Sequence, residues 1–311
     1  MIRHNITLSE ALQGYEIYVE ARRLSPHTIR DYFTTFRKLQ QFLGHDPPID
    51  DISRHDIQNF LKSFSEIKKK TLLNYHTGLS ALRSWLVADG LVEEHIVRQV
   101  PPPKPESMEI VPFTEYDIQL MLLACDRSKI YRRNGQYEPS YHALANHLRN
   151  RAIIFTLLDT GVRASELCKI TIEECDLKNR RISIYGKGAK QRMVPLSAKT
   201  GKTIWTYLTS REEKGPKDPV FASRRGYALT KDGLGQLIRR IGKRAGVANA
   251  YTHRFRHTFA ITYLRNNGDI FTLQRILGHS DLAIVKRYLA IARSDVNEGH
   301  RIASPVANWN I

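Results

Sequence analysis

Apolar residues at helical spacing run through the first hundred residues of the chain. Thr7 and Glu10 have the spacing of a capping box, which predicts a first helix start. Ser25 and Pro26 predict a second, because serine caps helices and proline fits the first helical position, and Gly44 predicts its end. The apolar positions are Ile29, Tyr32, Phe33, Phe36, Leu39, Phe42 and Leu43 in the second helix, Ile57, Phe60, Leu61 and Phe64 in a third, and Leu72, Tyr75, Leu79, Leu82, Trp85 and Leu86 in a fourth. Residues 1–100 are therefore expected to form a small helical bundle.

A proline-rich segment follows the predicted bundle. Pro101-Pro-Pro-Lys-Pro105 cannot continue a helix and reads as a stiff, extended stretch. A chain of 311 residues is long enough for two domains, each with its own core. We therefore expect a first domain over residues 1–100, a linker over 101–111 and a second domain over 112–311 that ends in a C-terminal tail.

The second half of the chain mixes helical and strand patterns. Arg181–Tyr185 and Arg192–Pro195 flank Gly186–Lys190, which predicts two short strands joined by a hairpin turn. Residues 127–146 have no clean periodicity and are expected to form a loop. Helices are predicted from Pro112, from His147 to Gly161, and at about 198–212, 230–245, 254–267, 270–277 and 281–291. The predicted fold class is mainly α with a small β-sheet.

Charge changes this picture, because the chain is strongly basic. It carries 48 Lys and Arg against 31 Asp and Glu, a net charge of +17, with a pI near 9.8. Up to Pro105 there are 14 basic and 12 acidic residues, so the remaining part of the chain carries most of the excess. This charge indicates a polyanionic partner, and double-stranded DNA is the one we expect. The alternative explanation is that the basic surface binds no ligand and only keeps the protein in solution.

Several other classes of protein are not indicated. No apolar run approaches the roughly 18 residues of a membrane helix, and the start has no secretion signal, so we expect a cytoplasmic protein associated with the nucleoid. Cys125, Cys168 and Cys175 lack the spacing of a disulfide framework or a zinc site. No ATP-binding loop or carboxylate cluster is present in the sequence, so no cofactor or metal is expected.

Four separated segments carry groups suited to a phosphodiester. They are Thr160-Gly-Val-Arg-Ala-Ser-Glu-Leu167, Tyr185-Gly-Lys-Gly188, Thr252-His-Arg-Phe-Arg-His-Thr258 and Leu277-Gly-His-Ser280, with Tyr288 beyond them. Each alone has an ordinary structural explanation, such as a surface arginine or a packing tyrosine. Two guanidinium groups are what a phosphodiester needs, because negative charge grows on its nonbridging oxygens in the transition state.

Together and in this order, the segments resemble the tyrosine recombinase or phage-integrase family, which includes the Xer-type recombinases. The resemblance covers residues 112–291 closely and implies a helical, SAM-like core-binding domain followed by an α+β catalytic domain. The family's catalytic positions fall on Arg163, Lys187, His253, Arg256, His279 and Tyr288. It implies that Tyr288 is the nucleophile and Lys187 protonates the departing 5′ oxygen. His253 would act as general base or hydrogen-bond partner of the phenol, and His279 would contact a nonbridging oxygen.

Further residues are expected to support this site. Glu166 should hold the Arg163 guanidinium, and His257 should be a structural hydrogen-bonding residue. Tyr251 and Tyr263 are rival nucleophiles with poorer positions in the sequence. Candidate contacts to DNA are Lys68, Lys69, Lys70, Lys190, Arg192 and Arg254, although the three lysines fit a solvated helix start equally well.

The resemblance implies site-specific recombination by transesterification. A 3′-phosphotyrosyl intermediate and a Holliday junction would form within a homotetramer on two DNA sites. Without DNA, a monomer is the expected state. DNA integration, transposition of a mobile element and resolution of chromosomes all remain open, as does docking of the tail on a neighbour. The alternatives are a type IB topoisomerase and an inactive DNA-binding accessory protein. Two departures from the family pattern are the long 127–146 segment and Asp281–Arg287, which lacks the usual Ser and Thr residues.

Overall fold

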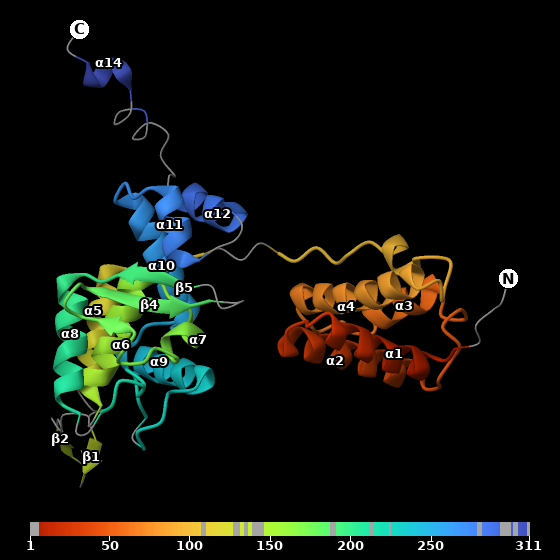
Figure 1. The fold of residues 1–311 in the computed structure, drawn as a ribbon, viewed down its shortest axis with the longest axis horizontal. Coiled ribbons are helices and arrows are strands. Elements are labelled where there is room, and N and C mark those ends of the chain that lie inside the picture. The colour runs from red at the N-terminus through yellow and green to blue at the C-terminus, as the bar shows by residue number, and fades with distance from the viewer. Residues whose placement is uncertain are drawn as a thin grey trace. The chain divides into compact units, whose positions relative to one another are not determined.

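The computed structural model divides into two compact units, Met1–Met108 and Glu109–Ile311 (Figure 1). The break lies within the segment 101–111 that the sequence marks as a linker. Each unit is described by itself. The structure describes residues 6–106, 110–126, 131–133, 136–138, 146–186, 191–211, 214–223, 225–278, 282–292, 300 and 304–309.

The first unit is a helical bundle, as the apolar pattern predicts. Thr7 and Glu10 form the predicted capping box, Ser25 caps the second helix, and Gly44 ends that helix in the left-handed conformation. These local signals are confirmed because each depends on hydrogen bonds within one turn of the helix end. The helices are α1 (Leu8–Ala21), α2 (Pro26–Leu43), α3 (Arg54–Lys62), α4 (Lys69–Ala88) and the 3₁₀ turn η1 (Ile96–Gln99).

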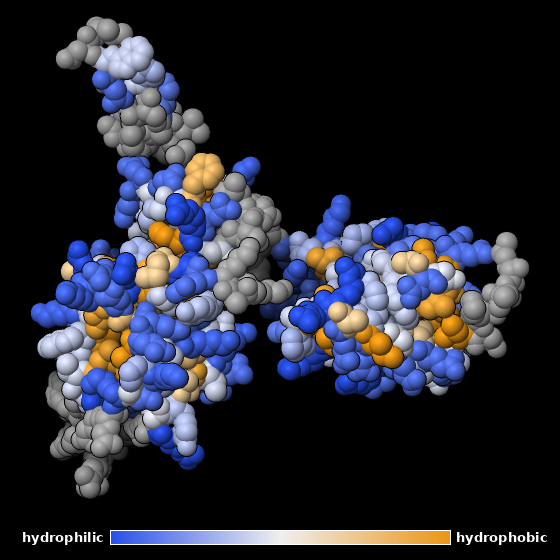
Figure 2. All heavy atoms as spheres, viewed as in Figure 1, coloured by the Kyte–Doolittle hydropathy of each residue, from blue (hydrophilic) through white to orange (hydrophobic). Residues whose placement is uncertain are grey.

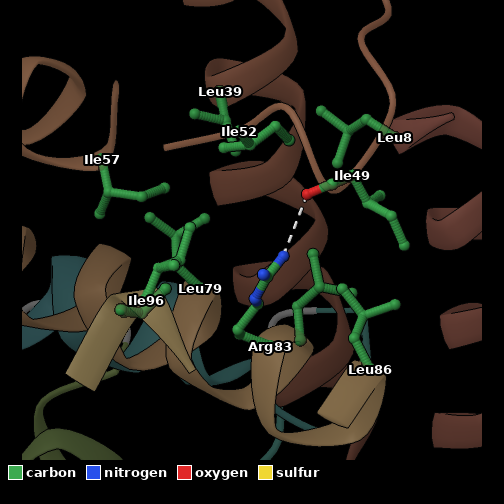
Figure 3. Close-up of a pocket in the computed structure, with 11 residues that line it drawn as sticks. Leu8, Leu39, Ile49, Ile52, Ile57, Leu79, Arg83, Leu86 and Ile96 are labelled. Atoms are coloured by element: carbon green, nitrogen blue, oxygen red, sulfur yellow. Dashed lines mark hydrogen bonds between the residues drawn. The ribbon is translucent and has the colours of Figure 1, made fainter. Parts of the chain in front are cut away.

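A buried arginine organises the core of this first unit. Arg83 of α4 donates from Nη1 to the Ile49 carbonyl oxygen at 3.1 Å and from Nε to the Glu94 carbonyl oxygen at 2.8 Å. Figure 3 shows the guanidinium among aliphatic side chains that line a cavity of about 30 Å³. A space of this size holds about one water molecule, so it is a packing feature of the bundle and no ligand site.

The second unit combines helices with a three-stranded antiparallel sheet of order β3-β4-β5. Strands β4 and β5 form the predicted hairpin, in register from Arg181 opposite Pro195 to Tyr185 opposite Gln191. The elements are α5 (Glu115–Asp126), β1 (Tyr131–Arg133), β2 (Gln136–Glu138), α6 (His147–Thr160), α7 (Ala164–Leu167), β3 (Cys175–Asp176), β4 (Arg181–Tyr185), β5 (Gln191–Pro195), α8 (Ala198–Thr209), α9 (Lys231–Ala245), α10 (Thr252–Arg265), α11 (Ile270–Leu277), α12 (Leu282–Ala292) and α14 (Pro305–Asn308). The predicted fold class, mainly α with a small sheet, is confirmed.

The expected loop over 127–146 contains two short strands instead. β1 and β2 pair antiparallel, with Tyr131 opposite Glu138 and Arg133 opposite Gln136. Strands of three residues are too short to show an alternating pattern, so the sequence signal was confined to the Asn134-Gly135 pair, which is typical of a hairpin turn. The turn itself lies outside the described residues.

Helix α10 lies at the centre of the helices that surround the candidate site described below. Helix α10 packs against α6 on one side and against α12 on the other, and α11 contacts both α12 and β5 (Figure 1). Hydrophilic residues cover most of the face shown in Figure 2, with hydrophobic side chains in scattered patches. Within the described ranges, no helix combines the length and the hydropathy that crossing a membrane requires.

Candidate active site

Helix α10 presents three of the predicted site residues within its first two turns. His253, Arg256 and His257 fall at helical spacing, so their side chains share one side of the helix. The Arg256 side chain is only 1% exposed. It donates from Nη1 to the Gly161 carbonyl oxygen at 2.8 Å and from Nη2 to the Leu277 carbonyl oxygen at 2.7 Å. Arg256 therefore joins the end of α6 to the end of α11.

Gly161 makes this approach possible. It ends α6 with φ of +60°, and a Cβ atom there would overlap the Phe259 ring and lie 2.9 Å from Leu277 Cδ2. A side chain at this position would push α10 and α11 away from the carbonyl oxygen that Arg256 binds. The helix end predicted at Gly161 is thus also a part of the site.

Gly161→Ala is expected to lower the free energy of unfolding of the second unit by about 2–4 kcal/mol. The alanine would have to adopt the left-handed conformation, and its Cβ atom would clash with Phe259 and Leu277. Gly246→Ala is the matched control, because Gly246 also ends a helix, at φ of +71°, but has no atom within 4 Å of its Cβ position. The control should cost only about 1–2 kcal/mol. Urea unfolding of both variants measures the difference, and equal losses would contradict the packing argument.

A carboxylate network holds Arg163, which caps the short helix α7. Glu166 accepts bonds from the backbone N–H of Arg163 at 2.8 Å and from Arg163 Nη1 at 2.9 Å. Arg192 of β5 donates from Nη1 and Nη2 to the two oxygens of the same carboxylate, at 3.0 and 2.8 Å. Burial raises the pKa of Glu166, but the bonds from Arg192 and Arg163 outweigh it and hold the pKa below its ordinary value. The network is therefore ionised at neutral pH, with the Arg163 side chain 40% exposed.

Tyr288 lies on α12 and is 2% exposed. It packs with Val285 in an apolar cluster formed by α10, α11 and α12. Its hydroxyl lies 2.9 Å from Nδ1 of His257 and forms a hydrogen bond with that ring. Burial raises the pKa of Tyr288, while the charges of Arg256, Arg287 and Arg163 act to lower it. The phenol is therefore protonated in this state, within reach of the charges of Arg163 and Arg256.

The two histidines of α10 are neutral at pH 7. Burial and the charges of His253, Arg256 and Arg287 lower the pKa of His257 to about 4. Partial burial, followed by the charges of Arg256 and Arg163, lowers the pKa of His253, whose ring lies edge-on to His257 with 4.5 Å between centroids. Each ring therefore keeps one unprotonated nitrogen that can accept a proton.

Four of the six predicted catalytic residues thus come together: Arg163, His253, Arg256 and Tyr288. Their charges influence one another, although the residues come from three separate parts of the sequence. Lys187 and His279 lie outside the described residues, as does Lys190. The described chain reaches Gly186, immediately before Lys187, and Gly278, immediately before His279.

The remaining candidates for DNA contact have different surroundings. Lys68, Lys69 and Lys70 are exposed at the start of α4. Arg254, only 12% exposed, instead donates to the carbonyl oxygens of Val111 and Ala248 at 3.0 and 2.7 Å. Arg192, 14% exposed, is bonded to Glu166. In both arginines all three guanidinium nitrogens, Nε, Nη1 and Nη2, donate within the protein, which does not favour a role as surface ligands for phosphate.

Comparisons with known proteins identify the family of the chain. A model of the phage integrase family matches residues 133–294, and one of its N-terminal SAM-like domain matches residues 12–90. Tyrosine recombinase XerC of Pelobacter propionicus is 27% identical over 310 residues, covering 96% of this chain and 97% of that protein. Tyrosine recombinase XerA of Thermococcus kodakarensis is 30% identical over 287 residues, covering 91% of each.

Solved structures share the fold. The Tn1549 transposon integrase in complex with circular intermediate DNA gives a TM-score of 0.74 at 20% identity, covering 96% of this chain and 98% of that one. A lambda integrase dimer bound to a COC′ core site gives 0.73 at 17% identity, covering 93% and 79%. Because the family model spans more than half of the chain and XerA is 30% identical over most of it, the chain belongs to the phage integrase family, with the Xer tyrosine recombinases among its relatives.

Proposed function

We propose that this protein is a site-specific DNA recombinase that cuts and rejoins strands through a 3′-phosphotyrosyl bond to Tyr288. One observation carries the proposal. The Tyr288 hydroxyl is hydrogen-bonded to His257, on the same helix as Arg256, and the charges of Arg256 and Arg163 both reach the phenol. A phenol within electrostatic range of two guanidinium groups fits attack on a phosphodiester, because the guanidinium groups offset the negative charge that attack creates.

The two arginines have complementary roles in this reaction. Arg256 is fixed by two backbone carbonyl oxygens, so its positive charge needs little reorganisation when the transition state forms. Arg163 is held on one side by Glu166 and is exposed on the other, where a DNA phosphate can approach. Together they would bind the nonbridging oxygens of one scissile phosphate.

Protons must move at both ends of the reaction. As the Tyr288 oxygen bonds to phosphorus, its proton passes to a neutral imidazole. His257 is already hydrogen-bonded to the Tyr288 hydroxyl, and the His253 ring lies edge-on to His257. The bond from phosphorus to the 5′ oxygen breaks, and by family analogy Lys187 supplies that oxygen with a proton while His279 contacts a nonbridging oxygen. A 5′ hydroxyl of another strand reverses these steps, so the bond energy is conserved and neither ATP nor a metal ion is needed.

The expected substrate is double-stranded DNA. The excess of basic residues in the second unit favours a polyanion, and the Tn1549 and lambda integrase structures contain DNA. We further propose a homotetramer on two DNA sites that passes through a Holliday junction, serving integration or transposition of a mobile element or resolution of chromosomes. Such a substrate places the protein in the cytoplasm with the nucleoid.

The test is a suicide substrate with a nicked site from the flanks of the encoding gene, incubated with the protein in EDTA. A covalent protein–DNA complex should form. Digestion with trypsin and nuclease should leave nucleotide on the peptide Tyr288–Arg293, which follows Arg287. Nucleotide on another peptide, or a complex that requires Mg²⁺, would contradict the proposal. Rapid relaxation of a supercoiled plasmid that lacks the site would instead indicate a topoisomerase.

A further inference from the structure

Arg192 of β5 contacts two different segments of the second unit with a single guanidinium. Nη1 and Nη2 bind the two oxygens of Glu166, and Nε donates to the Ile276 carbonyl oxygen at 2.8 Å. The side chain is 14% exposed, so these contacts are largely shielded from water. A bidentate arginine–carboxylate pair in such surroundings has a fixed geometry.

Each segment joined by Arg192 carries a residue of the proposed reaction. Glu166 also binds Arg163. Ile276 lies in the last turn of α11, and Gly278, which immediately precedes His279, lies against Arg192, since its Cβ position would be 3.1 Å from Nη1. In the sequence, Lys187 lies between β4 and β5, the strand that carries Arg192. One guanidinium therefore joins the segment that carries Arg163 to the end of α11.

Arg192 also limits the number of Arg163 N–H groups that Glu166 can bind. A carboxylate offers about four acceptor positions. Arg192 fills two of them and the backbone N–H of Arg163 a third, which leaves one for the Arg163 guanidinium. Among the described residues, Glu166 is the one side-chain partner that the structure gives to Arg163. The remaining N–H groups of Arg163 are thereby available to a phosphate.

We propose that Arg192 is a positioning residue for strand cleavage, which anchors Glu166, and through it Arg163, and fixes the end of α11 that precedes His279. This inference rests on the proposed function. It replaces the expectation from the sequence that Arg192 contacts DNA. A guanidinium that binds DNA would contribute affinity and salt dependence, whereas a positioning residue contributes to the rate of the bound complex.

The test compares Arg192→Gln with the wild type in single-turnover cleavage of the suicide substrate at saturating protein. Cleavage should slow by about 10- to 100-fold, since a shift of about 1 Å in a positioned group costs up to about 100-fold. The DNA dissociation constant and its salt dependence should stay within about 2-fold of wild type. Arg181→Gln is the matched control, because Arg181 is on the same hairpin and binds a carboxylate, Asp176 at 3.0 Å, outside the site. It should cleave at the wild-type rate.

A second substitution separates positioning from a general loss of structure. Glu166→Gln alone should also slow cleavage, and adding it to Arg192→Gln should cost less than the product of the two single losses, because both residues act through the position of Arg163. If Arg192→Gln does not fold, Arg192→Lys carries the test. Its ammonium cannot bind both Glu166 oxygens and Ile276 together, so cleavage should still slow, with DNA affinity unchanged.

Three results would overturn the inference. They are wild-type cleavage rates in the Arg192 variants, fully multiplicative losses when Glu166→Gln is added, or weaker binding with a shallower salt dependence and an unchanged rate at saturation. The last result would make Arg192 a DNA contact. If the wild type itself forms no covalent complex, the proposed function fails first, and the two failures are thereby distinguished.

Discussion

Tyr288→Phe should abolish the covalent complex with the suicide substrate, a loss of more than about 10⁴-fold. The substitution removes only the hydroxyl oxygen that would bond to phosphorus. The ring, which packs with Val285 in the cluster of α10, α11 and α12, is retained. The variant should therefore fold and bind DNA like the wild type, as measured by thermal unfolding and by DNA titration.

Tyr263→Phe is the matched control for this loss. Tyr263 lies on α10, is half-buried and packs against Gly268. It is one of the two rival nucleophiles in the sequence. Removal of its hydroxyl should leave the yield of covalent complex unchanged. A Tyr288→Phe variant that still traps DNA would show that another residue is the nucleophile, and a loss in Tyr263→Phe would point to that tyrosine.

Arg256→Lys should slow single-turnover cleavage by about 10²- to 10³-fold, the usual effect of losing one oriented donor to a developing oxyanion. Lysine keeps the charge, but an ammonium cannot reproduce the fork that binds Gly161 and Leu277 while facing a phosphate. The variant should also lose about 1–3 kcal/mol of stability from the carbonyl groups left without a donor.

Arg149→Lys separates the rate from the stability. Arg149 is another buried arginine of the second unit, 8% exposed, and donates to the Ala222 carbonyl oxygen at 2.9 Å. It lies in the first turn of α6, at the opposite end of that helix from Gly161. This variant should show a comparable loss of stability with near-wild-type cleavage. Similar rate losses in both variants would mean that Arg256 acts only through the fold.

Features defined by a few neighbouring residues could be predicted from the sequence. The capping box at Thr7, the cap at Ser25, the helix ends at Gly44 and Gly161, and the β4–β5 hairpin each depend on bonds between residues close in the chain. The helical spacing of the apolar residues predicts the helices that these caps and ends delimit. The three-residue strands β1 and β2 are not predicted because they are shorter than the run of about four to eight residues over which alternation identifies a strand.

The contacts that build the site could not be predicted in the same way. Arg192 and Glu166 are 26 positions apart, and His257 and Tyr288 are 31 apart. Such pairs depend on how strands and helices pack, which no local pattern records. For this reason the sequence placed Arg192 with the DNA contacts and gave His257 only a general structural role. One available signal was the spacing of His257, four residues after His253 on the same helix.

The end of α11 has an electrostatic consequence for a polyanionic substrate. The C-terminus of a helix can carry up to about half an elementary negative charge, which disfavours a nearby phosphate. Here the last two carbonyl oxygens of α11, those of Ile276 and Leu277, each accept a hydrogen bond from a guanidinium, Arg192 and Arg256 respectively. The partial negative charge at this helix end is therefore offset by two guanidinium groups. An end that would otherwise repel DNA holds two positive charges in place.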